Sequence, residues 1–177
     1  WNVTPKGKEF VYHYPSGITS TDENQLSYLP AKKLNLKKNG VKYTYYEGIF
    51  KSLDEVKSKG KKIDKGTMPY FIVDEAPVKD HYAYDFESWI NIPKTGVYRF
   101  FINSDDGARL YIDGKLLIDN DGSHSAARKG AKIALNKGFH EIKIEYFEDY
   151  MGQELKVRML GRNMPEQLIP ANLLFIK

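Results

Sequence analysis

Two aspartates stand side by side in the stretch SDDGARLYIDGKLLID, residues 104–119, and a glycine follows them. Asp105 and Asp106 could bind one ligand together only if both carboxylates reach the same point. Successive side chains of a regular strand point to opposite faces, so the two carboxylates would diverge there. A cis peptide bond between them would bring both to one hard cation such as Ca²⁺, which takes several oxygen ligands.

A simple turn explains the same residues without any ligand. Asp and Gly favour turns because Asp hydrogen-bonds nearby backbone and Gly tolerates a positive φ. On this interpretation an aspartate of the pair caps its own backbone and Gly107 takes the positive φ. Both interpretations, a cation site and a structural corner, are open at this stage.

The segments around these aspartates alternate with the period of two that is typical of β-strands. In residues 82–92 one face carries Tyr82, Tyr84, Phe86, Ser88, Ile90 and Ile92. Asp113-Gly114 stands between two short apolar runs, which is a strong signal for a two-residue hairpin. Further strands are expected at 41–48, 96–103, 108–112, 115–119, 131–135, 139–148 and 154–160. Many short strands with frequent turns predict an all-β fold, an antiparallel sandwich or barrel.

One short helix is expected at SLDEVKSKG, residues 52–60. Ser52 and Glu55 have the spacing of a capping box, and Gly60 suits the C-terminal end. The helix says nothing about function by itself.

Composition limits the functional classes. The 177 residues are 41% hydrophobic, enough for one domain with a core, and contain no cysteine, which excludes disulfides and thiolate metal sites. The net charge is +4, with lysine clusters at 32–38 and 57–62. Neither cluster interleaves arginine with aromatics, so solvated lysines are expected rather than a nucleic-acid surface. No apolar run is long enough to predict membrane insertion.

The run GVYRFFINSDDGARLYIDGKLLIDNDG, residues 96–122, resembles the signature of the PA14 family, the β-sandwich module named after the anthrax protective antigen. The flanks at 43–48, 86–93, 138–148 and 168–174 are similar to the family's other strands. The resemblance predicts a PA14-like antiparallel β-sandwich at 41–177. Residues 1–40 lie outside it and are interpreted as a linker or the end of a preceding domain.

The resemblance implies a binding module. Family members occur in glycosidases, adhesins and toxins, usually as accessory modules that bind sugar. The opening YYEGIFKSLDEV resembles copies attached to bacterial β-hexosaminidases and β-glucosidases. We therefore expect a carbohydrate-binding module of a secreted bacterial glycan-processing protein, at the cell surface, outside the cell or in the periplasm, beside a catalytic domain. The alternative is a structural or protein-interaction module that positions a neighbouring glycosidase domain and binds no sugar.

The resemblance also implies site residues. In the fungal adhesin branch the paired aspartates, joined by a cis peptide, hold a Ca²⁺ that contacts sugar hydroxyls, and Asp105 and Asp106 match that pair. The third ligand of that branch is an Asn in a later loop. The corresponding loop here, EDYMGQE at 148–154, contains no Asn. Asp149 is the expected substitute, and Glu148 is the next candidate.

Sugar sites usually combine an aromatic platform with a few convergent polar groups. Trp89, on the polar face of its strand, and Tyr150, in the later loop, are the candidate platforms, although either could serve packing. Asn120, in the loop after the hairpin, is a candidate polar contact. His140 lies on the same face of its strand as apolar residues, and we expect it to be a core histidine whose nitrogens are hydrogen-bonded.

The sequence favours a non-catalytic module. Glycoside hydrolysis needs two carboxyls about 5 to 9.5 Å apart, on either side of the scissile bond. Aspartates adjacent in sequence do not easily flank a bond in this way. The sequence also lacks a nucleophile elbow, a phosphate-binding glycine loop and a cysteine nucleophile.

Overall fold

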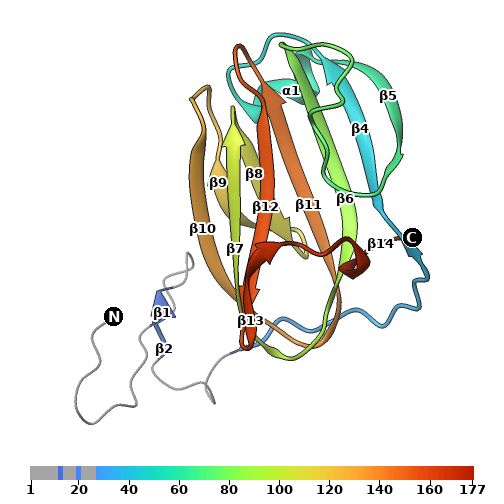
Figure 1. The fold of residues 1–177 in the computed structure, drawn as a ribbon, viewed down its shortest axis with the longest axis vertical. Helices are drawn as coiled ribbons and strands as arrows, with labels where there is room; N and C mark the ends of the chain where they lie inside the picture. The colour runs from blue at the N-terminus through green and yellow to red at the C-terminus, as the bar shows by residue number, and fades with distance from the viewer. Residues whose placement is uncertain (1–11, 14–18, 21–26) are drawn as a thin grey trace.

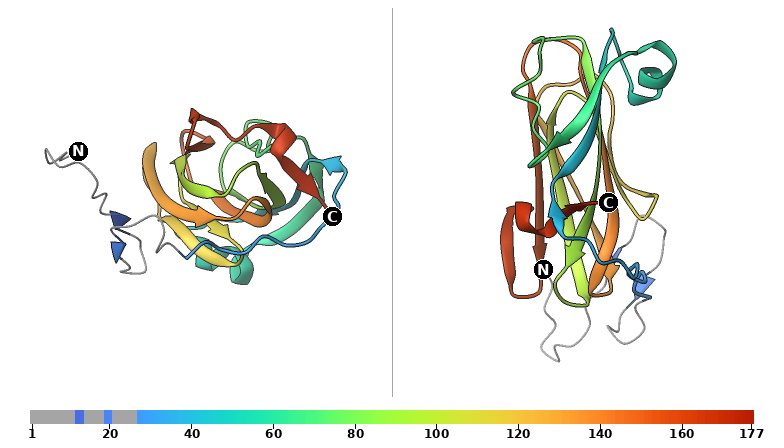
Figure 2. Two further views of the ribbon diagram at one scale, coloured as in Figure 1. Left: turned by 90° about the horizontal axis from the view of Figure 1, so that it is seen from below. Right: turned by 90° about the vertical axis from the view of Figure 1, so that its right-hand side faces the viewer.

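The computed structural model describes residues 12–13, 19–20 and 27–177. Two antiparallel sheets pack face to face, and α1 (Leu53–Lys59) lies outside the larger sheet at one end (Figures 1 and 2). The prediction of an antiparallel β-sandwich with one short helix is confirmed. No helix within these described ranges is long and apolar enough to cross a membrane.

The larger sheet has the order β3-β14-β6-β11-β8-β9, and β4 joins it by pairing with both β6 and β5. Its strands are β3 (Lys38–Asn39), β14 (Leu174–Ile176), β6 (Tyr82–Ile92), β11 (Gly138–Glu148), β8 (Ala108–Ile112), β9 (Lys115–Asn120), β4 (Val41–Glu47) and β5 (Lys61–Met68). The long β6 and β11 form its centre, because they pair over their whole length.

The smaller sheet has the order β10-β7-β12-β13. Its strands are β10 (Ala127–Leu135), β7 (Gly96–Asp105), β12 (Glu154–Gly161) and β13 (Met164–Leu168). A 3₁₀ turn, η2 (Ala171–Leu173), leads into β14, and the short β1 (Tyr12–His13) and β2 (Thr19–Ser20) pair with each other.

The core lies between the two sheets and follows the alternation of the strands. The face of β6 that the sequence predicted to be apolar is buried, and it includes Phe86, Ile90 and Ile92, each with none of its surface exposed. β7 contributes Phe100 and Ile102 from the facing sheet. This burial fixes the register of both sheets, because a slip of one residue would turn the apolar face to solvent.

The predicted helix is present, but its expected capping box is not. Ser52 is the N-cap residue and makes no side-chain cap bond. Glu55 Oε2 instead accepts the backbone N–H of Lys51 at 3.0 Å, which fixes the loop that precedes the helix. Gly60 ends the helix, where a Cβ atom would lie 2.4 Å from the Val56 carbonyl oxygen.

Residues 27–40 run along the lower end of the sandwich as drawn in Figure 1. Leu29 bridges to Leu135, Lys32 bridges to Phe139, and β3 pairs with β14. The interpretation of residues 1–40 as a linker or neighbouring domain falls largely on residues outside the described ranges, and it stays a prediction.

Several strands start or finish at the same end of the sandwich. Asp105 ends β7, Glu148 ends β11 and Asn120 ends β9, while β6 and β10 begin there. The antiparallel register requires this, since Glu148 pairs with Tyr82 and Glu154 pairs with Asp105. Loops far apart in the sequence therefore gather beside the aspartate pair.

Candidate functional site

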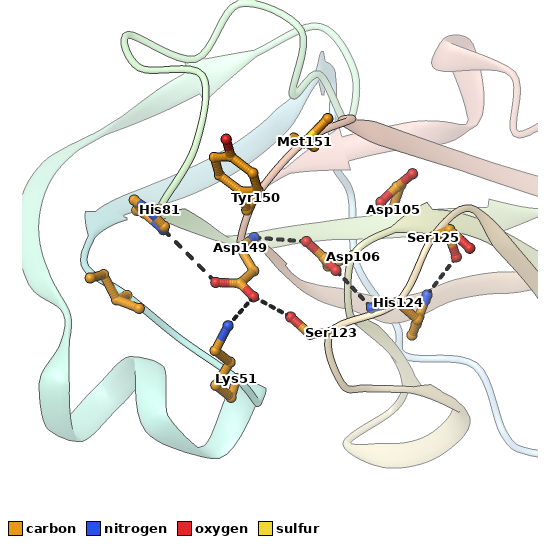
Figure 3. A pocket seen from close by; sticks show the side chains of 11 residues that line it. Lys51, His81, Asp105, Asp106, Ser123, His124, Ser125, Asp149, Tyr150 and Met151 are labelled. Atoms are coloured by element: carbon orange, nitrogen blue, oxygen red, sulfur yellow. Dashed lines mark hydrogen bonds and ion pairs between the residues drawn. The ribbon is translucent and has the colours of Figure 1, made fainter.

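A pocket of about 560 Å³ opens at this end of the sandwich (Figure 3). Four loops and the end of β7 form its walls. The lining residues are Ile49 and Lys51 before α1, His81 before β6, Asp105 and Asp106 after β7, Ser123, His124 and Ser125 between β9 and β10, and Asp149, Tyr150 and Met151 between β11 and β12.

The peptide bond between Asp105 and Asp106 is cis. Backbone N–H groups of two loops hold both carboxylates. His124 N donates to Asp106 Oδ1 at 2.7 Å, Asp149 N donates to Asp106 Oδ2 at 2.8 Å, and Ala126 N donates to Asp105 Oδ2 at 3.0 Å. Asp106 therefore caps backbone groups of two distant loops, and not its own backbone as the turn interpretation expects.

The expectation for Gly107 is wrong, because its φ is not positive. A Cβ atom at this position would lie 2.3 Å from the Phe147 ring and 3.0 Å from Asp121 Oδ1. Gly107 is therefore required by close packing against β11 and the β9–β10 loop, and not by the conformation of a turn.

Glu148 is the third carboxylate beside the pair. One oxygen each from Asp105, Asp106 and Glu148 lie within 4.8 Å of one another. Glu148 has none of its surface exposed, and its Oε2 hydrogen-bonds to the Tyr146 hydroxyl at 3.0 Å. Its Oε1 has no hydrogen-bond partner among the residues that the structure describes. Three acidic groups thus converge with an acceptor oxygen left over.

Burial and charge oppose ionisation of this cluster. Burial raises the pKa of Glu148 to about 8; the Tyr146 hydroxyl acts against that rise, and the charges of Asp106 and Asp105 add to it. Burial also raises the pKa of Asp105, although the Ala126 N–H counteracts it, and the charge of Asp106 raises it further. A divalent cation would relieve both effects, because it supplies the missing positive charge and accepts carboxylate oxygens as ligands. The three residues therefore fit Ca²⁺.

The structure places Glu148, and not the first-choice Asp149, with the aspartate pair. Asp149 Oδ2 instead contacts Lys51 Nζ and Ser123 Oγ, and its Oδ1 lies 3.9 Å from His81 Nδ1 (Figure 3). Burial acts to raise the pKa of Asp149, but its bonds to Lys51 and Ser123 outweigh that effect and lower it. The Asp149 carboxylate is satisfied by the protein and joins three loops of the pocket.

The two aromatic candidates lie in different parts of the molecule, and one of them lines the pocket. Tyr150 is 63% exposed and lines the pocket, and its ring stacks on His81 with centroids 6.4 Å apart. Trp89 is half-buried and lies opposite Phe175 of β14. It is eight residues along the chain from His81, or about 26 Å at 3.3 Å per residue. Trp89 therefore does not belong to this pocket.

Asn120 also lies outside the pocket lining. Its side chain is buried, and Nδ2 donates to Ser104 Oγ at 2.9 Å and to the Ala127 carbonyl at 3.4 Å. These bonds join β9 to β7 and β10. Asn120 thus stabilises the start of the β9–β10 loop, because its side-chain amide binds protein groups and not a ligand.

Arg109 on β8 supports the pocket from below and was not singled out from the sequence. Its guanidinium bonds to three carboxylates, those of Asp54, Asp119 and Asp121, at 2.7, 3.3 and 2.9 Å. Asp121 Oδ1 in turn accepts the backbone N–H of Leu53 at the start of α1. Arg109 thus ties the helix to the loop whose N–H groups hold the aspartate pair.

Sequence reasoning also missed Lys51, His81 and Ser123. They come from three separate loops, and the spacing between them follows no motif. The only local signal was the aspartate pair itself, which marked the end of the sandwich where such loops would gather.

The fold is thus an antiparallel sandwich with a pocket among its end loops. The family model of the PA14 domain matches residues 37–166. The chain therefore belongs to the PA14 domain family, whose members are generally non-catalytic binding or accessory modules.

Three similar proteins illustrate the range of this family. The anti-sigma-I factor RsgI3 of Acetivibrio thermocellus is 30% identical over 103 residues, which are 58% of this chain and 16% of that protein. A solved anti-sigma factor domain-containing protein has a TM-score of 0.67 and 25% identity, over 77% of this chain and 48% of that one. A PA14 sugar-binding domain from an RTX adhesin has a TM-score of 0.62 and 16% identity, over 80% of this chain and 100% of that one.

This chain spans about a sixth of the curated relative and about half of the first solved chain. The adhesin domain shares the fold, and at 16% identity the likeness extends no further.

Proposed function

We propose that this chain is a non-catalytic carbohydrate-binding module that holds a sugar in the pocket beside Asp105 and Asp106. One observation carries the proposal: half-buried Asp105 and buried Asp106 line a pocket that an exposed aromatic, Tyr150, also lines, and buried Glu148 lies beside the pair. The adhesin domain with the same fold, which is described as sugar-binding, supports it.

We propose Ca²⁺ as the group that joins this cluster to the sugar. Asp105, Asp106 and Glu148 would hold the ion, with Glu148 in the role that the family resemblance gives to an Asn. Bound there, Ca²⁺ supplies positive charge and coordination positions for sugar hydroxyls. The N–H groups of His124, Asp149 and Ala126 keep the two aspartates oriented whether or not the ion is bound.

The remaining pocket residues would orient the sugar ring. Tyr150 offers an exposed ring for the apolar C–H face of a sugar, and the His81 ring stacked behind it limits its rotation. Ser125 and Lys51 line the pocket and supply hydrogen-bond donors, whereas the hydroxyl of Ser123 already donates to Asp149. Exclusion of water between the ring and Tyr150 would strengthen each of these polar contacts.

The parent protein is also a matter for proposal. A cell-surface or secreted bacterial protein suits a glycan-binding module, whether a neighbouring domain processes glycans or, as the names of two relatives suggest, belongs to an anti-sigma factor. In the latter case the module would act as the part that recognises a ligand. The alternative is a module that only positions its neighbour.

A glycan array, run once with calcium and once with chelator, tests the proposal. Asp105→Asn is the matched variant, because it removes one charge but keeps an acceptor for Ala126 N–H. Glu87→Gln, on the exposed outer face of β6, is the control. Calcium-dependent binding that Asp105→Asn loses and Glu87→Gln keeps supports the proposal. Binding in both conditions contradicts the Ca²⁺ part, and a blank array in both favours the positioning role.

A further inference from the structure

Three large apolar side chains stand exposed around the polar floor of the pocket. Ile49 is 63% exposed, Tyr150 is 63% exposed and Met151 is 72% exposed. Ile49 comes from the loop before α1, whereas Tyr150 and Met151, labelled in Figure 3, come from the β11–β12 loop. We call Ile49, Tyr150 and Met151 the apolar rim.

The gathering of these side chains distinguishes them from ordinary surface residues. Seven large hydrophobic side chains are exposed in the described part of the chain, and three of them line this one pocket. Single exposed apolar residues are normal and need no explanation. A group of them around a pocket marks a surface that a ligand covers.

The backbone holds the rim in place. Met151 has a φ of +62°, which is uncommon for a residue other than glycine, and its N–H donates to Asp80 Oδ1 at 3.0 Å. Gly48, with a φ of +155°, precedes Ile49, and its N–H donates to the His81 carbonyl at 2.9 Å. Both rim loops are therefore anchored to the segment at residues 80–81, next to the pocket.

An unsubstituted sugar would leave part of this rim uncovered. Its hydroxyls suit the carboxylates and serines of the floor, and one C–H face suits Tyr150. Ile49 and Met151 would still face water. A methyl group on the sugar would cover them, and a carbonyl beside that methyl could accept a hydrogen bond from Lys51, whose side chain is 67% exposed in the pocket wall.

We infer that the pocket selects acetylated sugars, with the acetyl methyl against the apolar rim and the acetyl carbonyl toward Lys51. This inference rests on the proposed sugar-binding function and names its ligand class. Burial of one methyl group contributes roughly 0.8 kcal/mol, which is about a fourfold gain in affinity, and the hydrogen bond from Lys51 raises the expected preference to about tenfold.

Titration calorimetry on the whole chain, with calcium present, tests the inference with two matched probe pairs. Acetylated xylo-oligosaccharides are compared with the same material after alkaline removal of the acetyl groups. N-acetylchito-oligosaccharides are compared with cello-oligosaccharides, in which a hydroxyl replaces each acetamido group. The first pair tests an O-acetyl group and the second an N-acetyl group. We expect the acetylated member of at least one pair to bind about tenfold tighter.

A double variant, Ile49→Ser with Met151→Ser, should remove this preference without unfolding the protein, because both side chains are exposed. Leu116→Ser is the control, since Leu116 is 47% exposed near the start of β9, whereas the end of this strand leads to the pocket. Equal binding of both members of each pair overturns the inference and leaves sugar binding intact. A preference that survives in the double variant also overturns it. No binding to any probe, together with a blank array, contradicts both this inference and the proposed function.

Discussion

Two Asp-Gly corners stand at opposite ends of β8, and they use the same residue types differently. Asp113-Gly114 closes the hairpin to β9, with φ values of 48° and 76°. Asp113 Oδ2 lies 2.7 Å from His140 Nδ1, and its Oδ1 accepts the Glu141 N–H at 2.9 Å. The other His140 nitrogen lies 2.9 Å from the Asn136 carbonyl, so this corner is satisfied by the protein, and His140 is the core histidine that was predicted.

At the Asp105-Asp106-Gly107 corner the balance of hydrogen-bond donors and acceptors is the opposite. Its carboxylates also accept backbone N–H groups, but the side chain they face is another carboxylate, Glu148, with an unpartnered oxygen. Acceptors outnumber donors there, and a pocket adjoins them. The two corners therefore differ in their surroundings: donors of the protein satisfy Asp113, whereas a third acidic group adjoins Asp105 and Asp106.

The largest expected effect is an opposite response of the two corners to pH. An acid whose pKa is raised in the folded state stabilises the fold at pH values below its ordinary pKa, which is 4.5 for Glu148. This contribution is lost as the pH rises through the raised pKa of about 8. Each pH unit in that interval is worth about 1.4 kcal/mol, so Glu148→Gln should be more stable than the parent above pH 8 by up to about 5 kcal/mol in chelator. Urea unfolding at pH 5, 7 and 9 measures the difference.

Asp113 should respond with the other sign. Burial opposes the effect, but the bonds from His140 and Glu141 N–H lower the pKa of Asp113 below its ordinary 3.8. Its stabilising contribution is therefore complete above that value and lost as the pH falls through the lowered pKa. Asp113→Asn should be destabilised at neutral pH and approach the parent below pH 4. A Glu148→Gln variant with the parent's pH profile would contradict the contrast between the corners.

The second expected effect separates stability from binding. Asp113→Ala leaves His140 buried opposite a missing partner and should cost about 3 kcal/mol of unfolding free energy. Its glycan affinity should be unchanged in the folded fraction. Asp105→Asn should show the reverse, with more than about tenfold weaker binding and less than about 1 kcal/mol of destabilisation. Thermal unfolding and calorimetry on both variants measure the two effects, and loss of binding in Asp113→Ala at full folding would break the comparison.

Short-range patterns predicted the strands well, because burial of one face requires the alternation seen in β6. The same patterns identified Asp113-Gly114 as a hairpin and His140 as a core residue. They could not assign Gly107, since the reason for glycine there is the Phe147 ring, which is 40 residues away in the sequence. They also could not decide between Glu148 and Asp149 as the third acidic group. The alternation of a strand does not show that Lys51 and Ser123 already bind the Asp149 carboxylate.

The pocket walls were beyond local prediction for the same reason. Lys51, His81 and Ser123 lie on three loops that only the sheet register brings together, whereas Tyr150 was already a candidate because it follows Glu148 and Asp149. Trp89 was chosen because it lies on the polar face of its strand, but its position along β6 places it far from the end loops. The alternation of a strand predicts on which face a residue lies. A site at the end of a sandwich also depends on how far along the strand the residue stands.

The third expected effect concerns the two glycines. Gly107→Ala places a Cβ atom 2.3 Å from the Phe147 ring, so overpacking should cost about 2 to 3 kcal/mol and shift the carboxylate cluster. Gly114→Ala meets no atom within 4 Å but must keep a φ of +76°, which should cost about 1 kcal/mol and leave binding unchanged. Denaturant midpoints with calcium affinities measure both. Equal effects of the two substitutions would mean that both corners are simple turns.

The smallest expected effect tests how the β8 strand supports the acidic corner through Arg109. Arg109→Lys keeps the charge but cannot hold Asp54, Asp119 and Asp121 together, because an ammonium lacks the planar fork of a guanidinium. The loop that carries His124 and Ala126 should loosen, with about fivefold weaker binding, equivalent to about 1 kcal/mol. Hydrogen exchange at the His124 and Ala126 amides should accelerate, whereas the Asp113 corner should be unaffected.

Arg99→Lys, on the exposed face of β7, is the control for this substitution. Asp121→Asn should weaken binding by a similar factor, and the double variant with Arg109→Lys should add little, because both changes break the same link between α1 and the loop. Additive losses would show that Arg109 acts through Asp54 or Asp119 instead. A variant that loses stability while it keeps its affinity would show that Arg109 supports the sheet alone and that the acidic corner holds its geometry without it.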